Sequence, residues 1–420
     1  MNYKKFSNNA YNLHVINTDK FKTVMVKINF KNKIKEEDPT YRNLLTKVLT
    51  LSNENYKTKK DLEIACEDLY NLSLSTSNFI SGNYIITSFN GMFLNEKYTE
   101  ENMFFKSLQF IFDIIFKPNF DGEFAYFDLS KRLVKDEIDT YFDDPKNYSN
   151  YRILEEMGKN STLSYNPVGN TDILNKITNK DLYDYYNNLL KKDLVDIFII
   201  GDFDYNKLKD YIKNNFLIKT IKKPSQDHFL IHNKINKRAK TIKETKDLEQ
   251  SKLCIGFKLD KLTDFEKKYC LSIYNFILGG GPDSKLFKNV REKHSLCYTI
   301  NCNYRPVNNI MLINAGINSS DFKKCVNLIK KELSKMSNGD FDDNDIMAAK
   351  ITYINSLKEI EDNEPSILKI FESAEYLGFD LIDDRSKSIL NVTKQDIINL
   401  SKKIHLDTIY LLEGVENEEN

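Results

Sequence analysis

Histidine is scarce in this chain, which has five in 420 residues. A hydrolytic metal site needs several His, Cys, Asp or Glu ligands at fixed spacing. His228 and His232 have the i, i+4 spacing that places two ligands on one face of a helix. However, Ile231 stands where an inverted zinc motif needs its general base, and the pair lies in a lysine-rich segment with little periodicity. We therefore interpret both histidines as ordinary surface or strand residues.

Cysteines are also few, and no long apolar run occurs. The six cysteines include no Cys-x-x-Cys pair, which does not suit a disulfide framework. Residues 1–9 lack the apolar stretch of a secretory signal. The densest apolar segment, Phe104 to Phe116, contains Lys106 and Asp113 and is shorter than the ~20 residues that span a bilayer. We expect reduced thiols, a cytoplasmic location and no membrane association.

The chain has no net charge, because 61 basic residues balance 61 acidic ones. This balance gives no electrostatic basis for binding nucleic acid or an anionic membrane. The glycine run Gly279, Gly280 and Gly281 is not followed by Gly-Lys-Ser/Thr and lacks the dinucleotide-binding spacing. Its remaining interpretations are a flexible cap on a buried helix and a loop that a peptide backbone approaches closely. No Gly-x-Ser-x-Gly motif indicates a serine nucleophile.

Apolar residues are plentiful instead, at 41% of the chain, and the length favours two or more domains. An internal repeat divides the chain. Residues 177–182 (ITNKDL) match 392–397 (VTKQDI) at an offset of 215, which is 392 minus 177. A short helical segment and an apolar strand ending at glycine follow each copy, and the Thr and Asp in each suit a helix start.

A second repeated pattern supports the duplication. Asp144-Pro145 and Glu364-Pro365 each follow a long helical stretch, at an offset of 220, which is 364 minus 144. We predict two similar halves, residues 1–217 and 246–420, joined by a linker at 218–245 that is dense in lysine.

Within the first half, alternating apolar residues predict a strand at 21–30 and a hairpin formed by 71–79 and 84–93. Residues 104–115 carry apolar side chains at helical spacing. Strands that cluster, rather than alternate with helices, favour an α+β fold in which each half is an antiparallel sheet with helices.

Arg291 and Tyr298 place a cation and a phenol seven residues apart. Both can donate hydrogen bonds to a carbonyl oxygen or to a developing oxyanion. Each residue, taken alone, is more often part of a surface ion pair or the edge of a core.

These segments resemble the pitrilysin/insulinase type of metallopeptidase, an inverzincin family. The similarity covers roughly residues 10–414 and is most specific at 277–287 (ILGGGPDSKLF) and in the run from Val290 to Tyr298. Residues 167–170 (PVGN) and Gly201-Asp202 resemble the late part of the first half of such enzymes. The resemblance implies two α+β halves that close like a clamshell around extended peptides.

Active members carry His-x-x-Glu-His on a first-half helix, with a distal Glu completing the zinc site. The matching helix here is 41–49 (YRNLLTKVL), in which Asn43 replaces the first His, Thr46 the catalytic Glu and Lys47 the second His. The distal Glu would lie in the helix at 127–139. None of the three replacements can do the original task, so the resemblance implies a degenerate zinc site and no zinc bound by this chain.

The second-half signature is retained, and the resemblance implies that Arg291, Tyr298 and the loop Gly279, Gly280 and Gly281 bind substrate. Within the family the chain looks most like the zinc-less bacterial type linked with modification of elongation factor P. It would be the non-catalytic subunit of a heteromeric peptidase, inactive alone, whose partner is a zinc-bearing relative and whose substrate is an extended peptide. The alternative is an inert peptide-binding or scaffold protein of the same fold.

Overall fold

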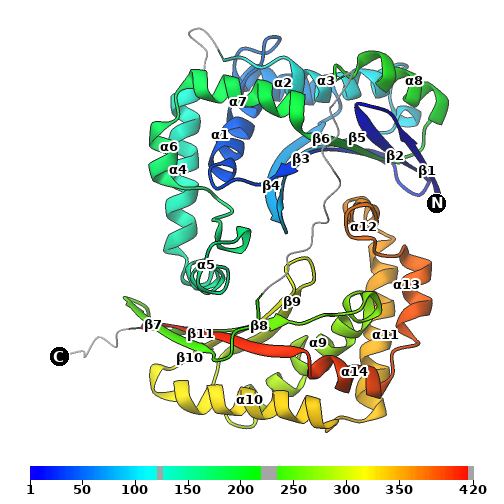
Figure 1. The fold of residues 1–420 in the computed structure, drawn as a ribbon. Coiled ribbons are helices and arrows are strands. Elements are labelled where there is room, and N and C mark those ends of the chain that lie inside the picture. Colours follow the sequence, from blue (N-terminus) through cyan, green and yellow to red (C-terminus); the bar gives the residue numbers. More distant parts are fainter. Residues whose placement is uncertain (121–125, 219–233, 415–420) are drawn as a thin grey trace. The chain divides into compact units, whose positions relative to one another are not determined.

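The chain folds into two compact units, seen in the computed structural model, which describes residues 1–120, 126–218 and 234–414 (Figure 1). Unit 1 comprises Met1–Thr140, Asn166–His228 and Asn363–Glu372. Unit 2 comprises Tyr141–Tyr165, Phe229–Asp362 and Ser373–Asn420. This division follows contacts rather than sequence repeats, so the predicted halves at 1–217 and 246–420 stay a prediction.

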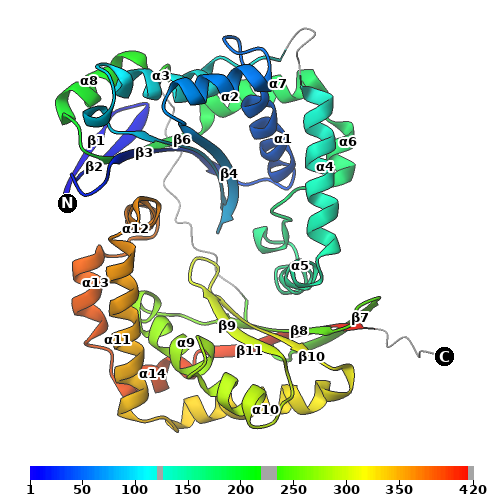
Figure 2. The same cartoon turned by 180° about the vertical axis from the view of Figure 1, so that it is seen from behind.

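Unit 1 is built on a six-stranded sheet with the strand order β1-β2-β6-β3-β5-β4. Helices lie over one face of this sheet in both views (Figures 1 and 2). The elements are β1 (Asn2–Ser7), β2 (Tyr11–Asn17), β3 (Thr23–Lys33), α1 (Asp38–Leu51), α2 (Lys59–Asp68), β4 (Ser73–Ser81), β5 (Tyr84–Leu94), α3 (Met103–Phe116), α4 (Phe127–Asp143), α6 (Thr171–Lys176), α7 (Asn179–Lys192), β6 (Leu194–Gly201) and α8 (Tyr205–Asn215).

Alternation along β3 explains how this sheet acquires its core. Val24, Val26, Ile28 and Phe30 are fully buried on one face, because strand side chains point to opposite sides in turn. The predicted strand at 21–30, the hairpin at 71–93 and the helical stripe at 104–115 are confirmed as β3, as β4 with β5, and as α3.

Unit 2 is built on a five-stranded sheet with the order β7-β11-β8-β10-β9. Its elements are α5 (Pro145–Met157), β7 (Lys240–Lys246), β8 (Ser251–Leu259), α9 (Leu271–Gly279), β9 (Thr299–Arg305), β10 (Ile310–Ile317), α10 (Phe322–Asn338), α11 (Asp343–Ile360), α12 (Glu364–Leu377, whose first residues belong to unit 1), α13 (Ile382–Ile389), α14 (Lys394–Ser401) and β11 (Ile404–Gly414), with π-helical turns at Glu266–Cys270 and Phe287–Glu292. Strand β7 begins inside the predicted linker at 218–245, so residues 240–245 of that segment are part of the sheet rather than a connection.

The internal repeat is visible in both sheets. In each, the last strand of the repeat, β6 or β11, lies between a parallel and an antiparallel neighbour. The expected antiparallel pairing therefore holds except for one parallel pair in each sheet, which arises because β6 and β11 enter the interior of their sheets after helical segments. Thr178 and Thr393 form capping boxes that start the preceding helices α7 and α14. The predicted helix starts are thus confirmed.

The repeated pattern of an acidic residue followed by proline, at Asp144-Pro145 and at Glu364-Pro365, lies at the start of two helices, α5 and α12. Each of these helices covers one face of a sheet. Helix α5 packs against β8 and β11 in unit 2, and a Cβ added at Gly256 would lie 2.1 Å from the Met157 sulfur. Glycine at position 256 therefore makes room for α5. In unit 1, the first residues of α12 contact β3, where Thr23 donates to Glu364 at 2.6 Å. The repeat thus places corresponding helices on corresponding sheet faces.

Glu244 of β7 holds α5 to the sheet of unit 2. Its carboxylate accepts hydrogen bonds from Arg152 (2.6 Å), Tyr148 (3.0 Å) and Tyr410 (2.9 Å). Burial alone would raise the pKa of Glu244, but these hydrogen bonds outweigh it and lower the pKa. The carboxylate therefore stabilises the folded state in its ionised form.

We expect Glu244→Gln to reduce the free energy of unfolding by about 1–3 kcal/mol at neutral pH, because a charge-assisted acceptor is lost. A carboxylate whose pKa is lower in the folded state than in the unfolded state contributes its full stabilisation above its ordinary pKa of about 4.3. This stabilisation disappears as the pH falls through the pKa of the folded state. The difference between the wild type and the variant in urea unfolding should accordingly narrow below that pH. Glu249→Gln, at an exposed carboxylate nearby in the chain, is the control. An equal effect of both substitutions would contradict this role of Glu244.

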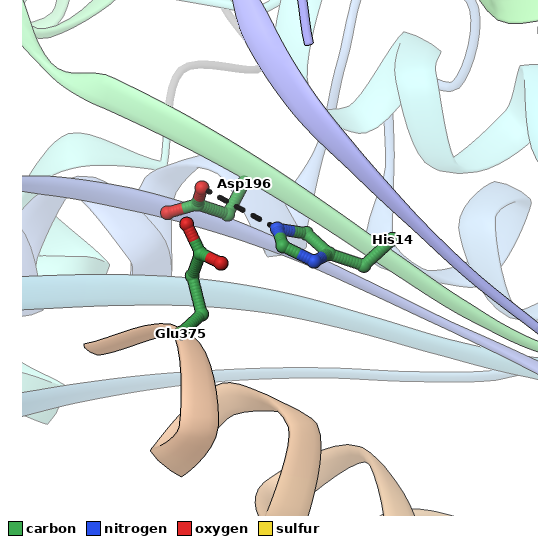
Figure 3. A group of neighbouring side chains, drawn as sticks. All are labelled: His14, Asp196 and Glu375. Atoms are coloured by element: carbon green, nitrogen blue, oxygen red, sulfur yellow. Dashed lines mark ion pairs between the residues drawn. The ribbon is translucent and has the colours of Figure 1, made fainter. Parts of the chain in front are cut away.

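The face of the unit 1 sheet opposite its helices is unusually polar. Asp196 of β6 is fully buried there and lies 2.7 Å from the Lys31 ammonium. Figure 3 shows its ion pair with His14, in which the Asp196 carboxylate lies 3.8 Å from His14 Nε2. Burial would raise the pKa of Asp196, but Lys31 and its other partners lower it well below the usual range. Around Asp196 this face is therefore held by ionic and hydrogen-bonded contacts, next to the stacked rings of His14 and Phe198, whose centres lie 4.3 Å apart.

All six cysteines are free thiols, as predicted. Among the described residues, no helix has both the length and the apolar character needed to cross a bilayer.

Candidate functional site

Helix α1 carries the three positions predicted to be a degenerate zinc site. It starts with Asp38 and Pro39, an acidic residue and a proline in the first turn, both of which suit a helix N-terminus. Leu45 and Val48 are buried on its core side. Asn43, which is half-buried, faces strand β4 and the loop before α6 through its hydrogen bonds.

One side chain of β4, Asn78, forms hydrogen bonds with both Asn43 and Thr46. The Asn78 amide donates to Asn43 Oδ1 at 2.8 Å and to Thr46 Oγ1 at 3.1 Å. The Asn43 amide in turn donates to the carbonyl of Val168 at 2.9 Å. The Thr46 hydroxyl donates to the carbonyl of Arg42 at 2.9 Å. These neutral groups satisfy one another, and neither offers the basic carboxylate or imidazole that water activation requires.

Lys47 forms an ion pair with Glu137 of α4. The carboxylate of Glu137 lies in the helix in which the resemblance places the distal Glu, and the sequence alone did not identify it. The structure thus sets an ammonium group beside the acidic side chain that this helix directs toward α1. A zinc ion does not fit this arrangement, because the ammonium carries the positive charge and has no lone pair to donate to a metal.

Arg42, the residue before Asn43, is buried behind the site, and no motif in the sequence distinguishes it. Its guanidinium donates to Asp193 at 2.6 Å, to the Phe30 carbonyl at 3.1 Å and to Thr87 Oγ1 at 3.1 Å. Burial alone would lower the pKa of Arg42, but the Asp193 carboxylate outweighs it and raises the pKa. The charge on Arg42 is therefore permanent and compensated.

Thr87 of β5 continues this network toward the site. Its hydroxyl donates to Asn78 Oδ1 at 2.6 Å, and Asn78 contacts Asn43. A continuous set of hydrogen bonds therefore runs from the buried Arg42 through two strands to the position of the first His of the motif. It orients Asn78 so that its amide points at α1.

The glycine run lies at the end of α9 in unit 2. A Cβ at Gly279 would lie 2.7 Å from Cys302 Cβ and 3.1 Å from the Cys302 backbone nitrogen. Glycine is therefore required at 279 by the approach of β9. Gly280 is the C-cap of the helix, and a Cβ at Gly281 would meet nothing within 4 Å. The first two glycines thus have a packing or capping reason, whereas open space beside Gly281 leaves the predicted substrate role as a prediction.

Arg291 and Tyr298 lie on either side of a short turn that precedes β9. The turn is closed by backbone hydrogen bonds, including Ser295 N to the Arg291 carbonyl at 3.0 Å. The Arg291 guanidinium lies 4.5 Å from the centre of the Phe287 ring. Tyr298 is 60% exposed, and among the residues that the structure describes no hydrogen-bond partner of its hydroxyl is found. The phenol is therefore available to a ligand and does not brace the fold through its hydroxyl.

His228 and His232 lie outside the described residues. Their interpretation as ordinary residues stays a prediction.

Comparison with known proteins shows the family and the fold of the chain. Residues 176–353 match the family model described as the peptidase M16 inactive domain. A Bacillus subtilis protein named probable inactive metalloprotease YmfF is 30% identical over 99% of both chains. The chain belongs to the M16 peptidase family.

Two solved structures confirm the M16 fold over the whole chain. A conserved protein from Enterococcus faecalis V583 has a TM-score of 0.91, with 25% identity and complete coverage of both chains. The peptidase M16 inactive domain from Pseudomonas fluorescens has a TM-score of 0.81, with 13% identity and complete coverage of both chains. The resemblance to pitrilysin/insulinase-type peptidases and the two-part α+β fold are thus confirmed.

Proposed function

We propose that this M16 protein is the non-catalytic subunit of a heteromeric zinc peptidase in the bacterial cytoplasm. The observation that carries the proposal is the contrast between its two sites. Asn43 and Thr46 are engaged with Asn78, and Lys47 with Glu137, so the motif helix offers no metal ligand and no base. Tyr298, in contrast, keeps an exposed phenol. A zinc-bearing relative would then supply the chemistry that this chain lacks.

Strand β4 supports a role in binding extended peptides. It is the edge strand of the unit 1 sheet and, among the described residues, pairs with β5 alone. An edge strand presents unpaired backbone groups that an extended peptide can match by adding one more strand. Asn78 connects this edge to the Asn43 position, so a peptide paired with β4 would run past the former zinc site.

Tyr298 and Arg291 would contribute donors to the reaction. Zinc in the partner would activate water and polarise the peptide carbonyl. Tyr298 would donate to the carbonyl oxygen as negative charge grows on it, and Arg291 would hold the substrate backbone. A preorganised donor of this kind contributes about 2.7–4 kcal/mol, or roughly 10²–10³ in turnover.

The test is a reconstitution with a zinc-bearing M16 partner, identified by its His-x-x-Glu-His motif in a neighbouring gene or by pull-down. Tyr298→Phe should reduce peptide turnover by the complex at least about tenfold without altering folding or complex formation. Tyr98→Phe, at another exposed tyrosine, is the matched control. Full activity of the complex with both Tyr298→Phe and Arg291→Ala would overturn the proposal and favour the inert scaffold.

A further inference from the structure

A groove of about 670 Å³ lies in unit 1 beside strand β4. Its walls come from β3, β4, β5 and the first turns of α12. Met25 and Met92 line it and provide flexible apolar surface, which adapts to side chains of different shape. The groove therefore combines a sheet edge with space for side chains.

The two faces of β4 have different neighbours. Asn78, at an even-numbered position, points to α1 through its hydrogen bonds to Asn43. Ser73, Ser75, Ser77 and Phe79, at odd-numbered positions, line the groove. Side chains of a strand alternate between faces, so a peptide paired with β4 would direct every second side chain into the groove. The three small serine side chains leave room for those of the peptide, and Phe79 bounds the groove at one end of the strand.

The charged side chains of the groove do not all compensate one another. Lys27 and Glu372 compensate each other at 2.7 Å, and Glu372 also accepts from Asn29 at 2.7 Å. Lys369 lies one helical turn before Glu372, lines the same groove and is exposed. In the part of the chain that the structure describes, Lys369 forms no ion pair. One ammonium group thus remains free to meet a ligand.

We propose that this groove selects peptides with an acidic side chain at a position that faces it, and that Lys369 is the residue that determines this preference. The inference rests on the proposed peptide-binding role of β4 and adds its specificity. An Asp or Glu side chain entering from the β4 edge would place its methylene carbons over Met25 and Met92 and its carboxylate near Lys369. The Ser75 hydroxyl and the Asn90 amide, which also line the groove, are able to donate to the same carboxylate.

The probes are three short fluorescein-labelled peptides in which Thr alternates with Glu, with Gln or with Lys. Binding to the full chain is measured by fluorescence anisotropy at low salt. The Glu peptide should bind at least about threefold more tightly than the Gln peptide, which is the size expected of one partly exposed ion pair. The Lys peptide should bind most weakly.

Lys369→Glu should reverse this order, so that the Lys peptide binds more tightly than the Glu peptide. Lys207→Glu changes the net charge equally at an exposed position of α8 and should leave the order as in the wild type. Equal binding of the three peptides, or the same shift in both variants, would overturn the specificity while leaving peptide binding intact. If none of the peptides binds, the peptide-binding role of β4 fails, and the specificity fails with it.

Discussion

We expect the unmodified chain to bind no stoichiometric zinc, and replacing Asn43, Thr46 and Lys47 by His, Glu and His should make it bind about one zinc ion. The substitutions supply two imidazoles one helical turn apart, and they remove the ammonium that now pairs with Glu137. Glu137 is then free to act as the third protein ligand. Purified protein analysed for metal content before and after the substitutions gives the answer directly.

The contribution of Lys47 is isolated by a matched variant. Asn43→His with Thr46→Glu keeps the ammonium beside Glu137 and should bind little zinc, because the cation position is already occupied by charge. Adding Glu137→Gln to the triple variant should remove the metal again. Circular dichroism confirms that each variant is folded. A tightly held zinc in the unmodified chain, or none in a folded triple variant, would show that α1 and α4 are not the degenerate site.

Arg42→Met should reduce the free energy of unfolding by about 3–5 kcal/mol, the effect of leaving one partner of a buried ion pair alone. Arg42 and Asp193 are 2% and 1% exposed, so the Asp193 carboxylate would remain buried without its counter-charge. The Phe30 carbonyl and the Thr87 hydroxyl would lose a donor as well. Urea unfolding of the full chain measures the change.

The double variant Arg42→Met with Asp193→Asn should recover part of this loss, because the buried charge is removed together with its partner. Arg132→Met, at an exposed arginine of α4, should change the stability by less than about 0.5 kcal/mol. If Arg42→Met were no more destabilising than Arg132→Met, the buried hydrogen-bond network of Arg42 would not stabilise the fold.

Much of the fold followed from short-range patterns. Apolar alternation predicted β3 and the β4–β5 hairpin, and the Thr-x-x-Asp pattern predicted the starts of α7 and α14. These features depend on periodicity and capping, which act between residues close in the chain. Parallel pairing in each sheet was not foreseen, since an apolar strand such as β6 has the same composition whichever neighbour it meets.

The residues of the candidate site also fall into two groups, those that a sequence motif identified and those that only the structure identified. The resemblance located Asn43, Thr46, Lys47, Arg291 and Tyr298 by their place in motifs. It did not identify Asn78, Thr87 or Glu137, whose importance comes from partners far away in the sequence. Polar residues such as these are common on strands and helices, and no local pattern distinguishes one that meets the motif helix.

The sequence by itself indicated an internal repeat and a resemblance to zinc peptidases, and that resemblance predicted a degenerate zinc site at Asn43, Thr46 and Lys47. These predictions need only the identity and order of residues. Tertiary structure alone decided that Lys47 meets Glu137, that Arg42 is buried against Asp193, and that α5 and the start of α12 each cover a sheet of the other part of the chain. The physical reason is that burial and charge pairing depend on distances between elements, and those distances are set only when the chain has folded.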